Sequence, residues 1–275
     1  MIMLAGAVLL VAAGWMASGR NEGRVQYGAT QSHTPDAGHS ALPCPANAAV
    51  VVLFGQSLAA NSGAFVYPAA GRGGGLTSTY IFHGGHCYPL GDPMPGATGK
   101  GGSVGPPLAL LASTALDRPV VMIAGAVSGS SILQWTPADS PFARALLDRL
   151  AQARRAGLAP SVYIWMQGEA DTGSNMTATR YADELRALHS RFPPAPWIVT
   201  ANSICTYRPV RSPMLDRARA SFAAITPDVH LDVDMDSLGM SYRQADRCHL
   251  NAAGQQEAAR RLATAVVSVL GRPGS

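Results

Sequence analysis

Serine, histidine and aspartate side chains occur where they could act together as a nucleophile, a base and an orienting carboxylate. Ser57 follows Gly55-Gln56 and an apolar, β-branched run at 50–54. Such a run suits a strand buried on both faces of a parallel sheet, so Ser57 would lie at its carboxyl end and open a helix. Ligands bind at that edge of open α/β sheets. Ser57 is therefore a candidate nucleophile, although a plain helix N-cap is the commoner use of such a serine.

Asp246 and His249 are the candidate carboxylate and base. They are three residues apart in a turn before a helix, so the carboxylate can reach one imidazole nitrogen and leave the other for Ser57. Taken alone, Asp-x-x-His describes a helix-capping aspartate near a surface histidine. Together with Ser57, the pair predicts nucleophilic catalysis.

Acyl transfer also needs hydrogen-bond donors for the oxyanion of the tetrahedral intermediate. We expect the backbone N–H groups of Ser57 and Gly129 and the side-chain amide of Gln167, which follows a buried strand. The alternative for Gln167 is a buried amide that bonds to loop backbone.

Glu169 and Asp171 could form the carboxylate pair of a glycosidase. Two acids at this spacing are instead expected to hold the Ser57 and Gly129 loops or to contact substrate.

Strand and helix patterns alternate along the chain and bring these side chains to one edge of a sheet. Apolar runs predict five strands, at 50–54, 120–125, 162–166, 197–201 and 229–233. The alternation predicts a parallel five-stranded sheet with helices on both faces. The glycine-rich stretch 62–102 is interpreted as a long loop, a feature that usually carries function.

Length and composition indicate one lightly charged globular domain behind an export signal. The chain has 275 residues, 47% hydrophobic and 14% charged, with net charge +4 and no basic run, so nucleic acid is not an expected partner. Residues 2–16 are apolar, short for a transmembrane helix, and followed by small residues suited to cleavage. We expect a signal peptide or anchor at 1–19, a disordered linker at 20–43 and one domain at 44–271. The protein would then be periplasmic or extracellular, and would meet the membrane only through an uncleaved anchor.

An even number of cysteines behind an export signal predicts two disulfides. No CxxC pair is present in the sequence, so a zinc site is not expected, and no other metal or cofactor is expected. The sequence does not determine the connectivity, nor the oligomeric state. We expect Cys44–Cys87 and Cys205–Cys248, because the latter two border strand ends on the edge that carries Ser57.

Five short motifs follow one another in the order GQS at 55–57, GGSVGP at 101–106, SGSSI at 128–132 with Trp135, WMQGEAD at 165–171 and DRCHLN at 246–251. They resemble the SGNH hydrolases, and within them the branch of sialate O-acetylesterases and acetylxylan esterases. The resemblance implies a flavodoxin-like three-layer α/β/α fold and metal-free removal of acetyl groups from an O-acetylated saccharide, sialic acid or xylan-like. By this resemblance, Ser57 is the nucleophile, His249 the base and Asp246 the orienting carboxylate. Gly129 and Gln167 take the two further oxyanion positions.

The chain departs from this branch beside the nucleophile, where Leu58 stands in place of the common asparagine and Asn61 comes later. Gln56 and Asn61 are expected to bind substrate or to support the site. Two other functions are compatible with the same residues. One is an extracytoplasmic polysaccharide O-acetyltransferase that uses the same triad. The other is a non-catalytic carbohydrate-binding protein, which would not need all three triad residues.

Overall fold

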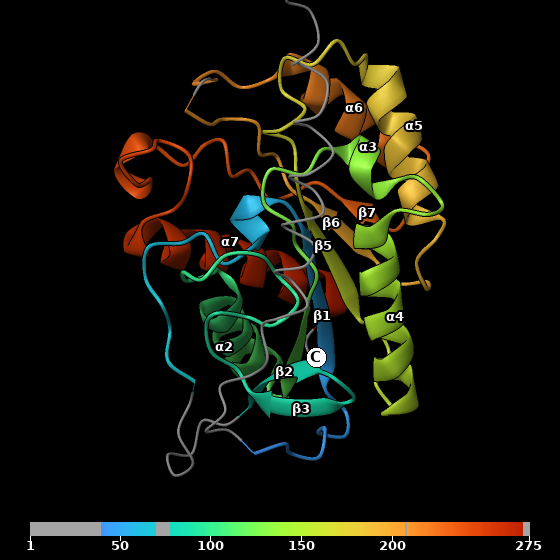
Figure 1. Ribbon diagram of the computed structural model, residues 1–275, viewed down its shortest axis with the longest axis vertical. Coiled ribbons are helices and arrows are strands. Elements are labelled where there is room, and N and C mark those ends of the chain that lie inside the picture. The colour runs from blue at the N-terminus through green and yellow to red at the C-terminus, as the bar shows by residue number, and fades with distance from the viewer. Residues whose placement is uncertain (1–39, 70–77, 207, 272–275) are drawn as a thin grey trace, which may run out of the picture.

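A sheet of seven strands runs through the middle of the molecule, with helices on both faces (Figure 1). The computed structural model describes residues 40–69, 78–206 and 208–271. The strands are β1 (Ala49–Gly55), β2 (Thr79–His83), β3 (His86–Pro89), β4 (Val120–Ala124), β5 (Val162–Met166), β6 (Trp197–Val199) and β7 (Val229–His230). Their order in the sheet is β3-β2-β4-β1-β5-β6-β7, and only the β2–β3 pair is antiparallel. The parallel strands β4-β1-β5-β6-β7 follow the order of flavodoxin-like folds.

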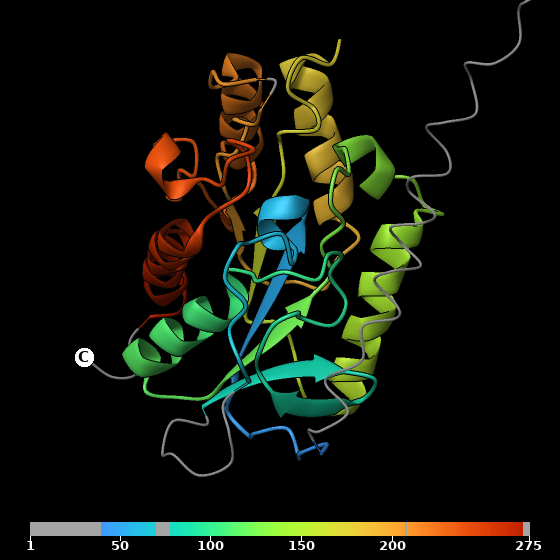
Figure 2. The same ribbon diagram turned by 60° about the vertical axis from the view of Figure 1, so that its left-hand side comes forward.

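Two apolar clusters pack on the two faces of the sheet because β1 is buried on both sides. Val51 and Leu53 face the cluster under α2 (Gly105–Leu116) and α7 (Ala252–Leu270), whereas Val52 and Phe54 face the opposite cluster. That cluster is covered by α4 (Pro141–Arg155), α5 (Ala178–His189) and α6 (Pro213–Ala223), with the short α3 (Ile132–Trp135) beside them. The three layers are visible in Figure 2, where α2 and α7 lie on one side of the sheet and α4 on the other. The predicted three-layer α/β/α architecture is therefore confirmed.

The prediction of a five-stranded sheet is wrong, although all five predicted strands are present. The two extra strands, β2 and β3, lie in the stretch 62–102 that was expected to be a loop. Gly84 and Gly85 have φ angles of 59° and 88° and form the turn between them. A Gly-Gly pair between two short β-prone runs is a hairpin signal, so the sequence contained the evidence for this hairpin.

Both expected disulfides are present. Cys44–Cys87 ties the N-terminal segment to β3, and Cys205–Cys248 ties the segment after β6 to the segment before α7. The predicted signal peptide or anchor lies outside the described residues, as does the predicted linker up to residue 39. Among the helices of the described ranges, none has the length and apolar character needed to cross a membrane.

Candidate active site

Ser57 opens the 3-10 helix η1 (Ser57–Ala59) directly after β1, at the carboxyl end of the central strand. Gly55 precedes it with a φ of 124°, and a Cβ atom at Gly55 would lie 2.2 Å from the carbonyl oxygen of Met166. Only glycine fits this close approach of β1 to β5. The chain therefore turns sharply and leaves Ser57 at the switch point between β1 and β5, where open α/β sheets bind ligands.

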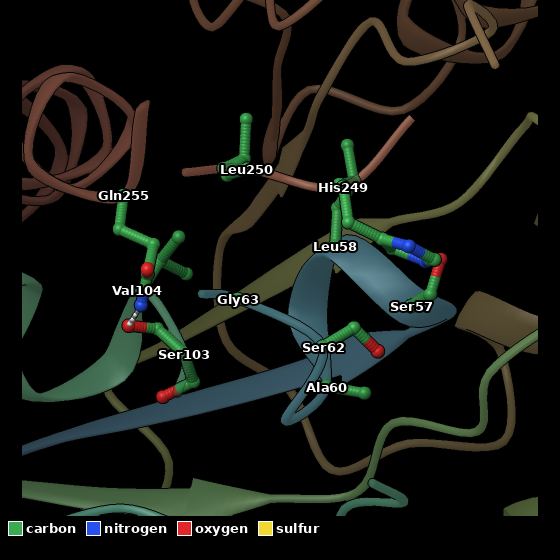
Figure 3. Close-up of a pocket in the computed structure, with 10 residues that line it drawn as sticks. All are labelled: Ser57, Leu58, Ala60, Ser62, Gly63, Ser103, Val104, His249, Leu250 and Gln255. Atoms are coloured by element: carbon green, nitrogen blue, oxygen red, sulfur yellow. Dashed lines mark hydrogen bonds between the residues drawn. The ribbon is translucent and has the colours of Figure 1, made fainter. Parts of the chain in front are cut away.

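His249 and Asp246 lie on an irregular segment between the 3-10 helix η2 (Met240–Tyr242) and α7. His249 Nδ1 is 2.6 Å from Asp246 Oδ2. His249 lines the same small pocket as Ser57, and its imidazole ring points toward the Ser57 side chain (Figure 3). Since Nδ1 is bonded to the carboxylate, Nε2 is the nitrogen left for a reacting group. The arrangement matches the base and orienting carboxylate that the Asp-x-x-His spacing predicts.

Asp246 is held in its ionised form by its hydrogen bonds. Burial raises its pKa, but the N–H groups of Cys248 and His249 and the imidazole outweigh burial, so the pKa lies below its ordinary value. The two N–H groups lie 2.9 Å and 3.0 Å from Oδ1. An anionic carboxylate is what stabilises an imidazolium during acyl transfer.

Residues 243–250, which carry Asp246 and His249, are called the acid–base segment here. A disulfide and side-chain hydrogen bonds hold this segment in place, because it has no helix or strand of its own. Cys248 is bonded to Cys205. The buried Arg243 donates from Nη1 to the carbonyl oxygen of Cys248 at 2.6 Å, and to two further carbonyl oxygens. The Thr206 hydroxyl donates to the carbonyl oxygen of Asp246.

Ser57 and Gly129 each carry an unused backbone donor. Among the described residues, no acceptor is bonded to the N–H of Ser57 or to that of Gly129. Gly129 follows β4 with a φ of 71° and is exposed. Both N–H groups are therefore free to donate to a bound oxyanion.

The Gln167 side chain is buried at the end of β5 and fully used within the protein. Its Nε2 donates to Asp171 Oδ2 at 2.5 Å, to the Ser130 carbonyl oxygen at 3.1 Å and to Gln56 Oε1 at 3.2 Å. Its Oε1 accepts from the Tyr181 hydroxyl at 2.5 Å. An amide nitrogen carries only two hydrogens. Gln167 is thus a buried amide, as in the alternative above, but only one of its four partners is loop backbone and the others are side chains, which favours a positioning role over direct donation to the oxyanion.

Gln56 and Asn61 are buried and bond mainly to backbone. Gln56 Oε1 accepts from the N–H groups of Gly168 and Ala170 at 3.4 Å and 3.1 Å. Asn61 makes three hydrogen bonds to the backbone of residues 94–97. Because their side chains bond within the protein, Gln56 and Asn61 are placed to support the site.

Glu169 and Asp171 are engaged with different segments. Asp171 Oδ2 accepts the N–H of Ile132 at 2.8 Å, just beyond the Gly129 loop. Glu169 Oε2 accepts from Asn202 at 2.9 Å, and Oε1 has no partner among the described residues. Glu169 also interacts with the charge of Arg243, on the acid–base side. Asp171 is thus bonded to the segment just after the Gly129 loop, whereas Glu169 is bonded to the segment after β6 and interacts with Arg243.

Burial changes the ionisation of both carboxyl groups. It raises the pKa of Glu169 to about 8, an effect that the Asn202 hydrogen bond and the Arg243 charge oppose only in part. It also raises the pKa of Asp171, against the hydrogen bonds from Ile132 and Gln167.

The pocket between Ser57 and His249 encloses about 180 Å³, including its open mouth. Figure 3 shows the other residues that line the pocket, of which four are apolar and three polar besides a glycine: Leu58, Ala60, Val104, Leu250, Ser62, Ser103, Gln255 and Gly63. Sequence reasoning missed Arg243, Gln244 and Gln255. Gln255 had a usable signal, because it lies four residues before Ala259 on the apolar face of the last helix.

A family model described as carbohydrate esterase, sialic acid-specific acetylesterase, matches residues 93–268. The chain belongs to this carbohydrate esterase family. The protein is therefore a carboxylic ester hydrolase, and the family implies an acetylated carbohydrate as its substrate. The matched range includes Gly129, Gln167, Asp246 and His249, while Ser57 precedes it.

Solved structures share the fold of this esterase at low sequence identity. A protein from Arabidopsis thaliana is 20% identical with a TM-score of 0.63, over 81% of this chain and 98% of that one. NanS is 17% identical with a TM-score of 0.55, over 82% of this chain and 98% of its own. A carbohydrate acetylesterase from Xanthomonas citri is 16% identical with a TM-score of 0.54, over 81% of this chain and 56% of that one. Curated protein sequences give no match. The resemblance to the sialate O-acetylesterases is confirmed by the family model, and these structures share the fold.

Proposed function

We propose that the protein is a serine O-acetylesterase that removes acetyl groups from a carbohydrate through an acyl-enzyme on Ser57. The observation that carries the proposal is the His249–Asp246 hydrogen bond of 2.6 Å, made by a ring that lines the same pocket as Ser57. The free N–H groups of Ser57 and Gly129 support it, because they can receive the negative charge of the tetrahedral intermediate.

In this mechanism, Ser57 Oγ attacks the acetyl carbonyl carbon while His249 Nε2 takes the hydroxyl proton. Asp246 stabilises the imidazolium, and the N–H groups of Ser57 and Gly129 stabilise the oxyanion. The imidazolium then protonates the sugar oxygen, which leaves as an alcohol. Water loses a proton to His249 and attacks the acyl-enzyme carbonyl; the bond to Ser57 Oγ then breaks, His249 returns the proton to Oγ, and acetate leaves. Gln167 acts by holding the loops that carry the donors.

We propose that the saccharide resembles O-acetylated sialic acid or acetylated xylan, as the motifs indicate. Two disulfides are typical of proteins that work in an oxidising compartment, which supports action outside the cytoplasm. We further propose that residues 1–19 direct export to the periplasm or the medium, either as a cleaved signal or as a retained anchor.

The test is release of acetate from p-nitrophenyl acetate, acetylated xylan and O-acetyl sialic acid by the wild type and by Ser57→Ala. We expect Ser57→Ala to lower kcat by about 10⁴-fold or more. The Ser62→Ala variant removes another hydroxyl from the same pocket and should retain most of the activity. A Ser57→Ala variant as active as the wild type would refute the acyl-enzyme. Acetate transfer to an added sugar in preference to water would favour the transferase.

A further inference from the structure

Gln244 joins the segment that carries the base to the segment that carries the nucleophile. Its Nε2 donates to the carbonyl oxygen of Ser62 at 2.8 Å and to that of Leu250 at 3.0 Å. Its backbone N–H donates to the carbonyl oxygen of His249 at 2.7 Å. Leu250 directly follows the base, and Ser62 lies on the chain that leaves Ser57. A single residue therefore bonds to both chain segments that carry the reacting pair.

Other hydrogen bonds between the two segments lie farther from Ser57 along the chain. The N–H of Ala64 donates to the Leu250 carbonyl oxygen at 3.0 Å. The buried Gln255 side chain accepts from the N–H of Phe65 at 2.8 Å and donates to its carbonyl oxygen at 2.9 Å. Among the hydrogen bonds of the described residues, the Gln244–Ser62 bond is thus the link between the segments that lies nearest to Ser57.

We propose that Gln244 is a positioning residue that holds the imidazole of His249 in line with Ser57. The proposal rests on the proposed acyl-enzyme mechanism and adds to it the residue that sets the distance between nucleophile and base. Gln244 acts on Ser57 and His249 indirectly, through its hydrogen bonds to the carbonyl oxygens of Ser62 and Leu250. A displacement of about 1 Å in such a pair can cost about 10²-fold in rate, so loss of this link should reduce kcat more than it changes KM.

The chemistry of the position requires a hydrogen-bond donor. Both neighbours of the Gln244 amide are carbonyl oxygens, which only accept, so the atom between them is the NH₂ nitrogen. A carboxylate at the same place would repel both oxygens. A methionine of similar length would fill the space without donating. A lysine would retain a donor, with more charge and more length.

The experiment measures kcat and KM for p-nitrophenyl acetate with the wild type and with Gln244→Met, Gln244→Glu and Gln244→Lys. Gln256→Met is the matched control, because Gln256 donates at 2.9 Å to the Tyr67 hydroxyl and contacts neither Ser62 nor Leu250. We expect the Met and Glu variants to lose about 10- to 100-fold in kcat, with KM changed by less than about threefold. Gln244→Lys should recover part of the loss, and Gln256→Met should stay within about twofold of the wild type.

Thermal unfolding of each variant shows whether it is folded, and if Gln244→Met is not, the Glu and Lys variants decide the question. A folded Met or Glu variant with wild-type kcat would overturn the proposal. Equal losses in the Met and Lys variants, with KM rising in step, would also overturn it, because packing rather than donation would then matter. A wild type as inert as Ser57→Ala would instead refute the proposed function, and with it the role of Gln244.

Discussion

The two sides of the candidate nucleophile are positioned in different ways. On the oxyanion side, Gln167 directly follows β5, Gly129 lies on the loop after β4, and buried side-chain bonds tie the two loops together. On the acid–base side, Asp246 and His249 lie on an irregular segment and are 42% and 30% exposed. A disulfide and the side chains of Arg243 and Gln244 hold that segment. Loss of a buried polar side chain on the oxyanion side should therefore reduce both stability and activity, whereas loss of a half-exposed side chain on the acid–base side, Asp246 or His249, should reduce activity with less effect on folding.

The largest effect is expected from Asp246→Asn, on the exposed side. The amide keeps an oxygen for the N–H groups of Cys248 and His249 but cannot stabilise the imidazolium or hold its tautomer. We expect kcat to fall by about 10⁴-fold, with little change in the free energy of unfolding. Steady-state kinetics and urea unfolding measure the two quantities. A loss below about tenfold would remove Asp246 from the triad.

Gln167→Leu tests the buried side, where both quantities should change. The substitution leaves Asp171, Gln56 and the Tyr181 hydroxyl without one of their partners. We expect the free energy of unfolding to fall by about 2–4 kcal/mol, because buried polar groups lose their hydrogen bonds. We also expect kcat to fall by about 10²-fold as the Gly129 loop shifts. A variant as stable as the wild type with only kcat reduced would show that Gln167 donates to the oxyanion directly.

The two disulfides sharpen the comparison because both join cysteines 43 residues apart. In the chain-entropy model they make similar contributions to stability, typically about 2–4 kcal/mol each. Paired Cys→Ala substitutions at Cys44 and Cys87 should therefore cost about as much stability as those at Cys205 and Cys248. Only the second pair should also lower kcat, by about tenfold, because only Cys248 adjoins His249. Equal kcat in both double variants would show that the Cys205–Cys248 bond does not position the base.

The smallest effect on kcat is expected from Glu169, whose substitution should instead change the pH dependence of stability. Burial raises its pKa from the ordinary 4.5 to about 8, so within this window the folded protein keeps a proton that the unfolded chain releases. The free energy of unfolding therefore loses a contribution from Glu169 as pH rises from about 4.5 to 8. Glu169→Gln cannot titrate and should show a smaller decline between pH 6 and 8 in urea unfolding.

Asp92→Asn is the control for this measurement, because burial raises the pKa of Asp92 only to about 6. Its substitution should alter the pH dependence mainly below pH 6. Identical slopes for the wild type and Glu169→Gln between pH 6 and 8 would mean that Glu169 ionises normally in the folded protein.

The sequence by itself determined the parallel core and the candidate triad. The apolar runs that form β1, β4, β5 and β6 are buried strands, and parallel strands bring their carboxyl ends to one edge, so Ser57, Gly129 and Gln167 were expected near one another. The Asp246–His249 bond followed from a spacing of three residues, which is local geometry. The hairpin of β2 and β3 was also encoded, by Gly84-Gly85, but was obscured by the glycine-rich stretch around it.

Only the tertiary structure decided what the polar side chains around the triad do. Gln167 and Glu169 are two residues apart at the end of β5, yet one bonds toward the Gly129 loop and the other lies toward Arg243. Gln244 bonds to Ser62 across 182 positions of the chain. Hydrogen bonds act over about 3 Å and depend on the direction of each group, so a partner this distant in sequence becomes a neighbour only when the strands and loops have packed. Residue type and spacing indicate which groups can react, and packing decides which of them hold the others in place.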